Sequence, residues 1–176
     1  MANDEQSCCS SNTPQPSPPR WRRYLPLIVL IALTLLAAAA KQIHYGSWEM
    51  RSAMHDFMGL FLLVFSMLKL FDLNGFATSF RKYDLLAIKL PSYALLYPFL
   101  ELLLALSYLA HWQPQFTYVF TLVLMSFGAL GVFRALRSEL DINCACMGST
   151  LNVPLSTVAV VENLGMTTMA VIMLLT

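Results

Sequence analysis

Five stretches of mostly apolar residues, each about 15 to 20 residues long, restrict the fold of this chain more than any other feature. They cover residues 24–40, 57–71 (from about Met54 if a first polar turn is included), 91–110, 116–133 and 158–176. A helix needs ~20 residues to cross a hydrocarbon core of about 30 Å. The chain is also 57% hydrophobic and 12% charged, which is too apolar for a soluble domain of 176 residues. The sequence therefore predicts an all-α integral membrane protein with about five transmembrane helices, embedded in the lipid bilayer.

The first 53 residues are expected to stand apart from the main domain. Residues 1–23 are rich in proline and serine and poor in apolar side chains, so we predict a disordered cytoplasmic tail. Residues 24–41 follow three arginines and are interpreted as a retained transmembrane helix. A signal peptide is the alternative, although Ala37–Ala40 matches a cleavage site only loosely. Residues 54–176 are predicted to form a four-helix membrane domain, to which the first helix is an addition.

Lysine and arginine are distributed unevenly between the two sides of the predicted helices. With the amino terminus inside, nine of them lie on the inner side and only Lys41 and Arg51 on the outer side. Such a bias sets the orientation of membrane proteins. We therefore expect a multi-pass protein of the cell (inner) membrane, with the amino terminus in the cytoplasm and the carboxyl terminus outside. The net charge of +1 argues against a nucleic-acid partner.

Three charged residues lie inside or close to the predicted spans. Lys69 is near the end of the second span, Glu101 is in the middle of the third, and Glu162 is near the start of the last. A charge within the bilayer is costly and by default marks a functional or paired site. Their depths along the helices place all three in the cytoplasmic half, so we expect one polar pocket there. For Glu101 a structural alternative stays open, in which a protonated carboxyl group bonds to a tyrosine or to a facing helix.

The cysteines form two close pairs, Cys8-Cys9 in the tail and Cys144-x-Cys146 between the last two spans. Four predicted crossings separate the pairs, so both are expected on the cytoplasmic side, where thiols are normally reduced. A disulfide between Cys144 and Cys146 would close a small, strained and easily reduced ring, which suits thiol–disulfide exchange. Two alternatives remain. The four thiolates of Cys8, Cys9, Cys144 and Cys146 select soft ions such as Cu(I) or Zn, or the cysteines are incidental.

Two further expectations concern the membrane surfaces. Apolar residues spaced by three and four, opposed by basic residues, predict one short amphipathic helix over residues 76–90 on the inner surface. On the outer side, His55 falls in the first turn of the second span, and we expect it to be solvated or interfacial rather than a metal ligand.

Two groups of residues resemble a known family. The first lies between Gly59 and Leu109 and the second follows the fourth span. The first group comprises Phe65-Ser66-Met67-Leu68-Lys69-Leu70, Gly75-Phe76, Tyr83 and Pro98-Phe99-Leu100-Glu101-Leu102, and the second comprises Cys144-Ala145-Cys146-Met147-Gly148, Pro154-Leu155 and Glu162-Asn163. Over residues 54–176 the chain resembles the MauE/DoxX group of small bacterial membrane proteins. The second group is more similar to the MauE branch, the methylamine utilisation proteins.

The resemblance implies a four-helix membrane core and a redox-associated role in methylamine metabolism. In that role, the protein helps to process, transport or mature the disulfide-rich small subunit of methylamine dehydrogenase, together with a thioredoxin-like partner. A phosphate loop, a nucleophile–base triad and a metalloprotease motif are absent from the sequence, so an accessory protein fits better than an enzyme. The leading hypothesis is a thiol-redox or maturation accessory using Cys144 and Cys146, with Glu101, Glu162 and Lys69 lining the site. The alternative is a soft-metal carrier that uses both cysteine pairs.

Overall fold

The computed structural model describes residues 20–46, 48–82, 84–137 and 155–176, and these residues form seven helices with no strand among them. The helices are α1 (Arg20–Tyr45), α2 (Met50–Phe71), α3 (Leu73–Phe80), α4 (Leu85–Lys89), α5 (Pro91–Leu109), α6 (Pro114–Arg137) and α7 (Leu155–Leu175). Five of them are long and apolar enough to cross a membrane: α1, α2, α5, α6 and α7. The predicted all-α integral membrane fold with five spans is confirmed.

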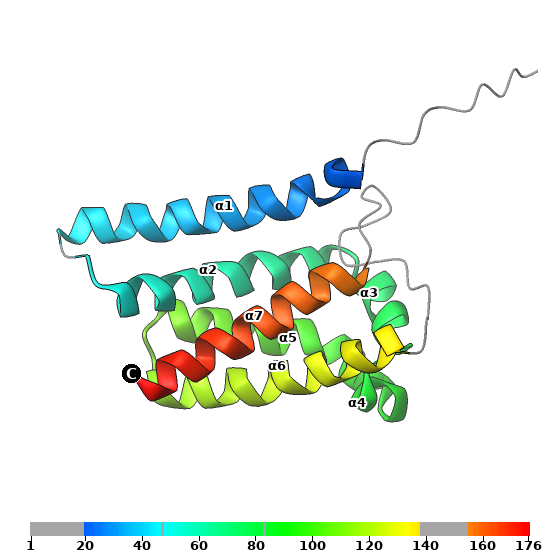
Figure 1. The fold of residues 1–176 in the computed structure, drawn as a ribbon. Coiled ribbons are helices and arrows are strands. Elements are labelled where there is room, and N and C mark those ends of the chain that lie inside the picture. The colour runs from blue at the N-terminus through cyan, green and yellow to red at the C-terminus, as the bar shows by residue number, and fades with distance from the viewer. Residues whose placement is uncertain (1–19, 47, 83, 138–154) are drawn as a thin grey trace, which may run out of the picture.

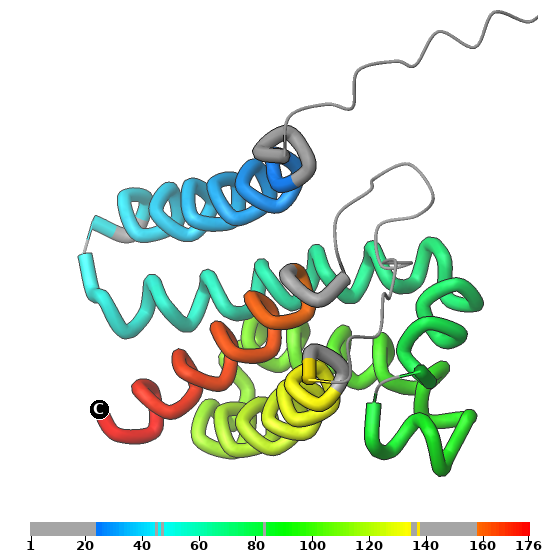
Figure 2. The backbone as a smooth tube through the Cα atoms, turned by 45° about the vertical axis from the view of Figure 1, so that its right-hand side comes forward, coloured from blue at the N-terminus to red at the C-terminus, as the bar shows by residue number. Residues whose placement is uncertain are grey.

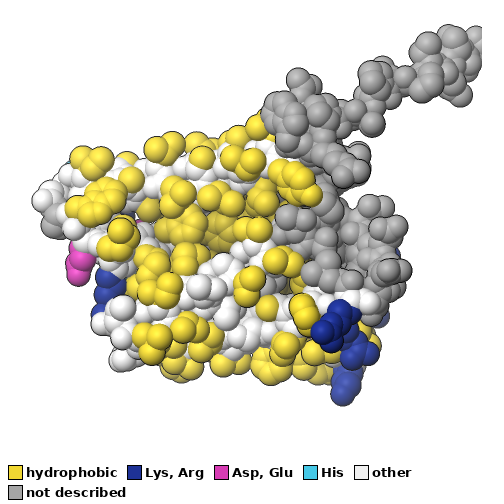
Figure 3. All heavy atoms as spheres, viewed as in Figure 1, with side chains coloured by type: hydrophobic (Ala, Val, Ile, Leu, Met, Phe, Trp, Pro, Cys, Tyr) yellow, Lys and Arg dark blue, Asp and Glu magenta, His cyan; other side chains and the backbone are white. Residues whose placement is uncertain are grey.

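The core of the protein is a bundle of α2, α5, α6 and α7, in which α2 packs along α5 and α6 packs along α7 (Figure 1). Each pair is antiparallel, because its members run in opposite directions between the two ends of the bundle (Figure 2). Glycine permits the close approach of α2 to α5: a Cβ added to Gly59 would lie 2.9 Å from the Cβ of Tyr108. The outward side chains are mostly apolar (Figure 3), as expected for helices surrounded by lipid.

One end of the bundle carries the two short helices α3 and α4, and we call it the α3–α4 end. The last residues of α2 and α6 and the first residues of α1, α5 and α7 lie at this end (Figure 1). Pro91 begins α5, a position where the missing N–H costs nothing because the first amides of a helix have no partner within it.

Helix α1 packs mainly against α2 and leaves much of its apolar surface exposed. It continues to Tyr45, four residues beyond the predicted end at residue 41. Lys41 and Gln42 explain the difference, because both bond to the buried carboxylate of Asp56 on α2. Because Lys41 and Gln42 have partners within the protein, α1 continues past the end of its apolar stretch.

The prediction of one amphipathic helix over residues 76–90 is wrong. The segment forms two helices, and the break lies before Asp84, whose carboxylate Oδ1 accepts hydrogen bonds from the N–H groups of Leu86 and Ala87. An aspartate in this position is a helix N-cap, which starts a new helix. Phe76 and Phe80 are buried against Tyr97 of the bundle.

Asp84 lies outside the membrane-spanning helices and gives the first testable prediction. Its side chain is 1% exposed, and Oδ2 has no hydrogen-bond partner. Burial raises the pKa of the Asp84 carboxyl group, although the two backbone hydrogen bonds oppose this effect. The folded protein therefore holds this proton more tightly than the unfolded chain, so stability falls as pH rises from the ordinary carboxyl range through the raised pKa.

Asp84→Asn keeps an oxygen that can cap α4 and removes the titration. We expect the free energy of unfolding to fall less steeply with pH in the variant than in the parent, measured by titration with sodium dodecyl sulfate from about pH 4 to about pH 8. Other titrating groups are common to both proteins and cancel in the difference. Parallel pH dependences would show that the Asp84 proton is bound equally in both states.

Candidate functional site

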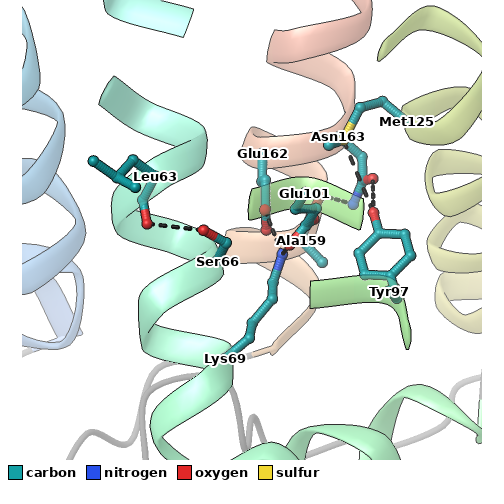
Figure 4. Close-up of polar contacts among 9 residues, drawn as sticks. All are labelled: Leu63, Ser66, Lys69, Tyr97, Glu101, Met125, Ala159, Glu162 and Asn163. Atoms are coloured by element: carbon teal, nitrogen blue, oxygen red, sulfur yellow. Dashed lines mark hydrogen bonds and ion pairs between the residues drawn. The ribbon is translucent and has the colours of Figure 1, made fainter. Parts of the chain in front are cut away.

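A buried lysine lies between two carboxylates in the core of the bundle (Figure 4). The Nζ atom of Lys69 donates to Oε1 and Oε2 of Glu101, both at 2.6 Å, and to Oε1 of Glu162 at 2.5 Å. The exposed fractions of the three side chains are 3%, 0% and 2%. We call Lys69, Glu101 and Glu162 the charged triad. It joins three helices: α2, α5 and α7.

The positions of the three residues along their helices bring them to one depth. Glu101 lies ten residues after the start of α5 and Glu162 seven residues after the start of α7. At 1.5 Å per residue these positions are about 15 Å and about 10 Å from the α3–α4 end. Lys69 starts in the last turn of α2, close to that end, and its long side chain points inward to the carboxylates (Figure 4). The structure thus brings together the three residues that the sequence placed in one pocket.

The charges of the triad determine how many protons it holds when it is neutral. One ammonium balances one carboxylate, so the triad is neutral only when Glu101 and Glu162 share one proton between them. A net charge in a bilayer interior is expensive, which favours the neutral state in which the two carboxylates hold one proton between them. Because the Lys69 ammonium already donates to both carboxylates, it is poorly suited to stabilise a thiolate as well.

Aromatic and amide groups surround the triad. The Lys69 ammonium lies 5.3 Å from the ring centroid of Tyr97 and 5.6 Å from that of Phe76, within the range of cation–π attraction. The Tyr97 hydroxyl donates to Oδ1 of Asn163 at 3.3 Å, and Nδ2 of Asn163 donates to the Ala159 carbonyl at 2.8 Å. Asn163 was noted in the sequence only as part of a motif; its contact with Tyr97 depends on how α5 and α7 pack.

The space beside the triad is small. A cavity of about 10 Å³ is lined by Lys69, Phe76, Phe80, Tyr97, Val158, Ala159, Glu162 and Asn163. This volume is at the lower limit for one water molecule. Among the residues that the structure describes, this space accommodates a water molecule but not an organic substrate.

Gly128 of α6 permits the packing around Asn163 and gives the second prediction. A Cβ at position 128 would collide with Oδ1 of Asn163 and lie 3.3 Å from the Tyr97 hydroxyl. We therefore expect Gly128→Ala to displace the Asn163 side chain and to lower the free energy of unfolding by about 1–3 kcal/mol. Unfolding in sodium dodecyl sulfate measures the effect.

The matched control for Gly128 is Gly165 on the neighbouring helix α7. A Cβ at this position meets open space. Gly165→Ala is expected to leave stability unchanged or to raise it by up to about 1 kcal/mol, through helix propensity. Equal effects of the two substitutions would contradict the packing described here.

The candidate cysteines, Cys144 and Cys146 of the loop and Cys8 and Cys9 of the tail, lie outside the described residues. The structure does define where the loop segment 138–154 joins the bundle. It follows the last residue of α6, Arg137, and precedes the first residue of α7, Leu155, and both lie at the α3–α4 end. The triad lies at the cytoplasmic depth predicted for it only if this end faces the cytoplasm.

The opposite end of the bundle contains a second polar cluster that the sequence did not reveal. His55 is buried: its Nε2 donates to the Tyr108 carbonyl at 2.8 Å, and its Nδ1 accepts from the Tyr118 hydroxyl at 2.7 Å. The expectation of a solvated or interfacial His55 is therefore wrong. Next to it, Asp56 pairs with Lys41 at 2.6 Å. The only signal in the sequence was a pair of adjacent polar residues inside a span.

The soft-metal hypothesis requires a group of side chains that can bind a metal ion. Among residues 20–46, 48–82, 84–137 and 155–176, no group of three or more histidine, cysteine, aspartate or glutamate side chains is arranged to hold a metal ion. The four cysteines on which the hypothesis depends lie outside these ranges, so it stays a prediction.

The fold and the charged triad define this protein as a multi-pass helical membrane protein with an ionic centre in its core. The chain belongs to the family of the methylamine utilisation protein MauE, whose family model matches residues 20–176. The matched region includes α1, which lay outside the resemblance seen in the sequence. A search of the curated proteins and of the solved structures found no match. The family places the protein among MauE-like membrane accessory proteins.

Proposed function

We propose that this protein is a membrane accessory protein that exchanges disulfides with a client through Cys144 and Cys146, and that the charged triad serves this chemistry as a proton site. The observation that carries the proposal is the position of the triad. A buried centre that is neutral with one shared proton lies about 10–15 Å from the end of the bundle where the segment with both cysteines is attached.

The exchange follows the ordinary chemistry of a dithiol. The thiolate of one cysteine attacks a client disulfide, forms a mixed disulfide and releases one client sulfur, which takes up a proton. The second cysteine then attacks the mixed disulfide and releases the other client sulfur. Two electrons have passed to the client, and Cys144 and Cys146 are joined by a disulfide. A thioredoxin-like dithiol partner reduces this disulfide and is itself oxidised, which restores the starting state.

The triad has a defined part in this sequence. A thiol must lose its proton before it attacks, and a leaving sulfur must gain one. With a net charge of −1 the triad acts as a base, and in its neutral state it acts as an acid. Proton transfer by a positioned group typically contributes about 10²–10⁴-fold to a rate.

We further propose that the α3–α4 end faces the cytoplasm, as the distribution of lysine and arginine predicts. Arg81, Lys82, Lys89 and Arg137 lie at this end, whereas Lys41 and Arg51 lie at the other. The MauE resemblance suggests the disulfide-rich small subunit of methylamine dehydrogenase as the client. It also suggests that a thioredoxin-like protein is the redox partner.

Single cysteine variants test the exchange. With Cys146→Ser, the mixed disulfide on Cys144 loses its resolving thiol and accumulates. Cys144→Ser tests the opposite case, in which Cys146 attacks the client and Cys144 resolves the mixed disulfide. Cells are quenched in acid, free thiols are alkylated, and adducts are detected on non-reducing gels with and without dithiothreitol. We expect a reducible adduct in one single variant and none in Cys144→Ser/Cys146→Ser, with Cys8→Ser/Cys9→Ser behaving as the parent. Absence of an adduct from both single variants would overturn the proposal.

The same variants separate the alternative function, a soft-metal carrier. That function predicts Cu(I) or Zn binding by the purified protein, with loss of the metal in both double cysteine variants. If the purified protein binds metal in this way and no mixed disulfide is detected, a soft-metal carrier replaces disulfide exchange as the function.

A further inference from the structure

The α3–α4 end exposes four basic residues together with apolar side chains. Arg81 and Lys82 follow α3, Lys89 ends α4 and Arg137 ends α6. All four are exposed, and none forms an ion pair with a residue that the structure describes. Figure 3 shows a patch of lysine and arginine side chains at this end of the molecule, and a smaller group at the opposite end. We call these four residues the basic collar.

The apolar neighbours place the collar at the membrane surface. Phe71, Ile88 and Leu90 are 81%, 56% and 59% exposed, as expected of side chains that face lipid at the edge of the bundle. The Arg137 guanidinium lies 4.9 Å from the ring centroid of Phe133, a side chain of α6 that also faces outward. A cation beside a lipid-facing ring lies at the level of the headgroups.

The described acidic residues nearest the collar, Asp72 and Asp84, form no ion pair with it. Asp84 is buried and bonds to backbone amides inside the protein. Asp72 is exposed, but its carboxylate accepts from the N–H of Gly75. Helix dipoles favour cations at the carboxyl-terminal ends of helices, and they account singly for Lys89, Arg137 and Arg81, the C-cap of α3. They account neither for Lys82 nor for the exposed apolar residues beside the collar.

We propose that the basic collar binds the headgroups of anionic phospholipids in the surrounding leaflet, so that this end of the protein selects anionic over zwitterionic lipid. The phosphate and net negative charge of such a headgroup complement the four cations of the collar, and its chains lie against Phe71, Ile88 and Leu90. Clusters of four or more basic residues next to membrane spans bind anionic lipid in this way. The proposal is independent of disulfide exchange and of the charged triad.

Native mass spectrometry of the full-length protein in detergent tests the proposal. The protein is offered equal amounts of phosphatidylglycerol and phosphatidylcholine, and the ratio of bound lipids is measured at low and high salt. We expect a preference of at least about fivefold for phosphatidylglycerol, which decreases with salt. It should be close to one in Arg81→Gln/Lys82→Gln/Lys89→Gln/Arg137→Gln.

Single substitutions supply the matched comparison. Lys89→Gln should lower the preference, and Arg51→Gln, at the opposite end, should leave it unchanged. Inorganic phosphate at millimolar concentration should not displace the lipid. An unchanged preference in the fourfold variant, an equal effect of Arg51→Gln, or displacement by free phosphate would each overturn the assignment of the collar to anionic lipid.

Discussion

Lys69→Met is expected to lower the free energy of unfolding by about 3–5 kcal/mol, because the substitution leaves two carboxyl groups buried without their cation. Glu101 and Glu162 are almost fully buried, so solvent does not replace the missing charge. Unfolding by sodium dodecyl sulfate in mixed micelles measures the loss. The same substitution at the exposed Lys89 of α4 is the control, and its effect should stay within about 0.5 kcal/mol.

Removing the whole triad should be far less harmful than removing its lysine. In Lys69→Met/Glu101→Leu/Glu162→Leu no charge is left unpaired, and apolar side chains of similar length fill the core. Replacing a buried ionic group in this way is often neutral or stabilising by about 1–4 kcal/mol. If the triple variant were as unstable as Lys69→Met, the loss could not be attributed to unpaired carboxyl groups.

Asp56→Ala is expected to lower the free energy of unfolding by about 1–3 kcal/mol and to loosen the end of α1. The Asp56 carboxylate accepts from Lys41 at 2.6 Å and from Gln42 at 3.2 Å. Lys41 is 35% exposed and regains water, which limits the loss. Gln42 is buried and keeps only its bond to Ser52. Hydrogen exchange in nanodiscs should show faster exchange of the amides in the last turn of α1, up to Tyr45, and unchanged exchange in α5 and α6.

Asp72→Ala is the matched control for this experiment. Asp72 is an exposed aspartate at the opposite end of the bundle, where it caps α3. Its loss should cost about 1 kcal/mol, as expected for an N-cap, without any change in α1. If Asp56→Ala left exchange at the end of α1 unaltered, the contacts of Lys41 and Gln42 would not be what holds α1 to α2.

The large elements of the fold were predictable because the bilayer imposes a length on them. The apolar stretch ending at Phe71 and the one beginning at Pro91 coincide with helix ends in the structure. The depth of Glu101 and Glu162 followed from counting residues along helices, and their meeting with Lys69 was expected from depth alone. The packing of the bundle was needed to see the distances within the triad, the joining of α2, α5 and α7, and the cation–π contacts of Lys69.

Other features depended on contacts between residues distant in the sequence. His55 resembles an interfacial residue until α5 and α6 supply the Tyr108 carbonyl and the Tyr118 hydroxyl. The extension of α1 depends likewise on Asp56. The break before Asp84 was different: an aspartate followed by an apolar run is a known start signal for a helix, and the regular apolar spacing across it concealed the signal.

The most direct test of the account measures disulfide exchange in Lys69→Met/Glu101→Leu/Glu162→Leu, the variant expected to fold without the charged triad. Both proteins also carry Cys146→Ser, or Cys144→Ser if Cys144 is the cysteine that resolves the mixed disulfide. The purified parent and variant are mixed with a small aromatic disulfide near neutral pH. The release of its thiol is followed with time. If the triad is the proton site of the reaction, exchange in the folded variant is slower by at least about tenfold. Equal rates in the two proteins would contradict that role and leave the triad as a structural link between α2, α5 and α7.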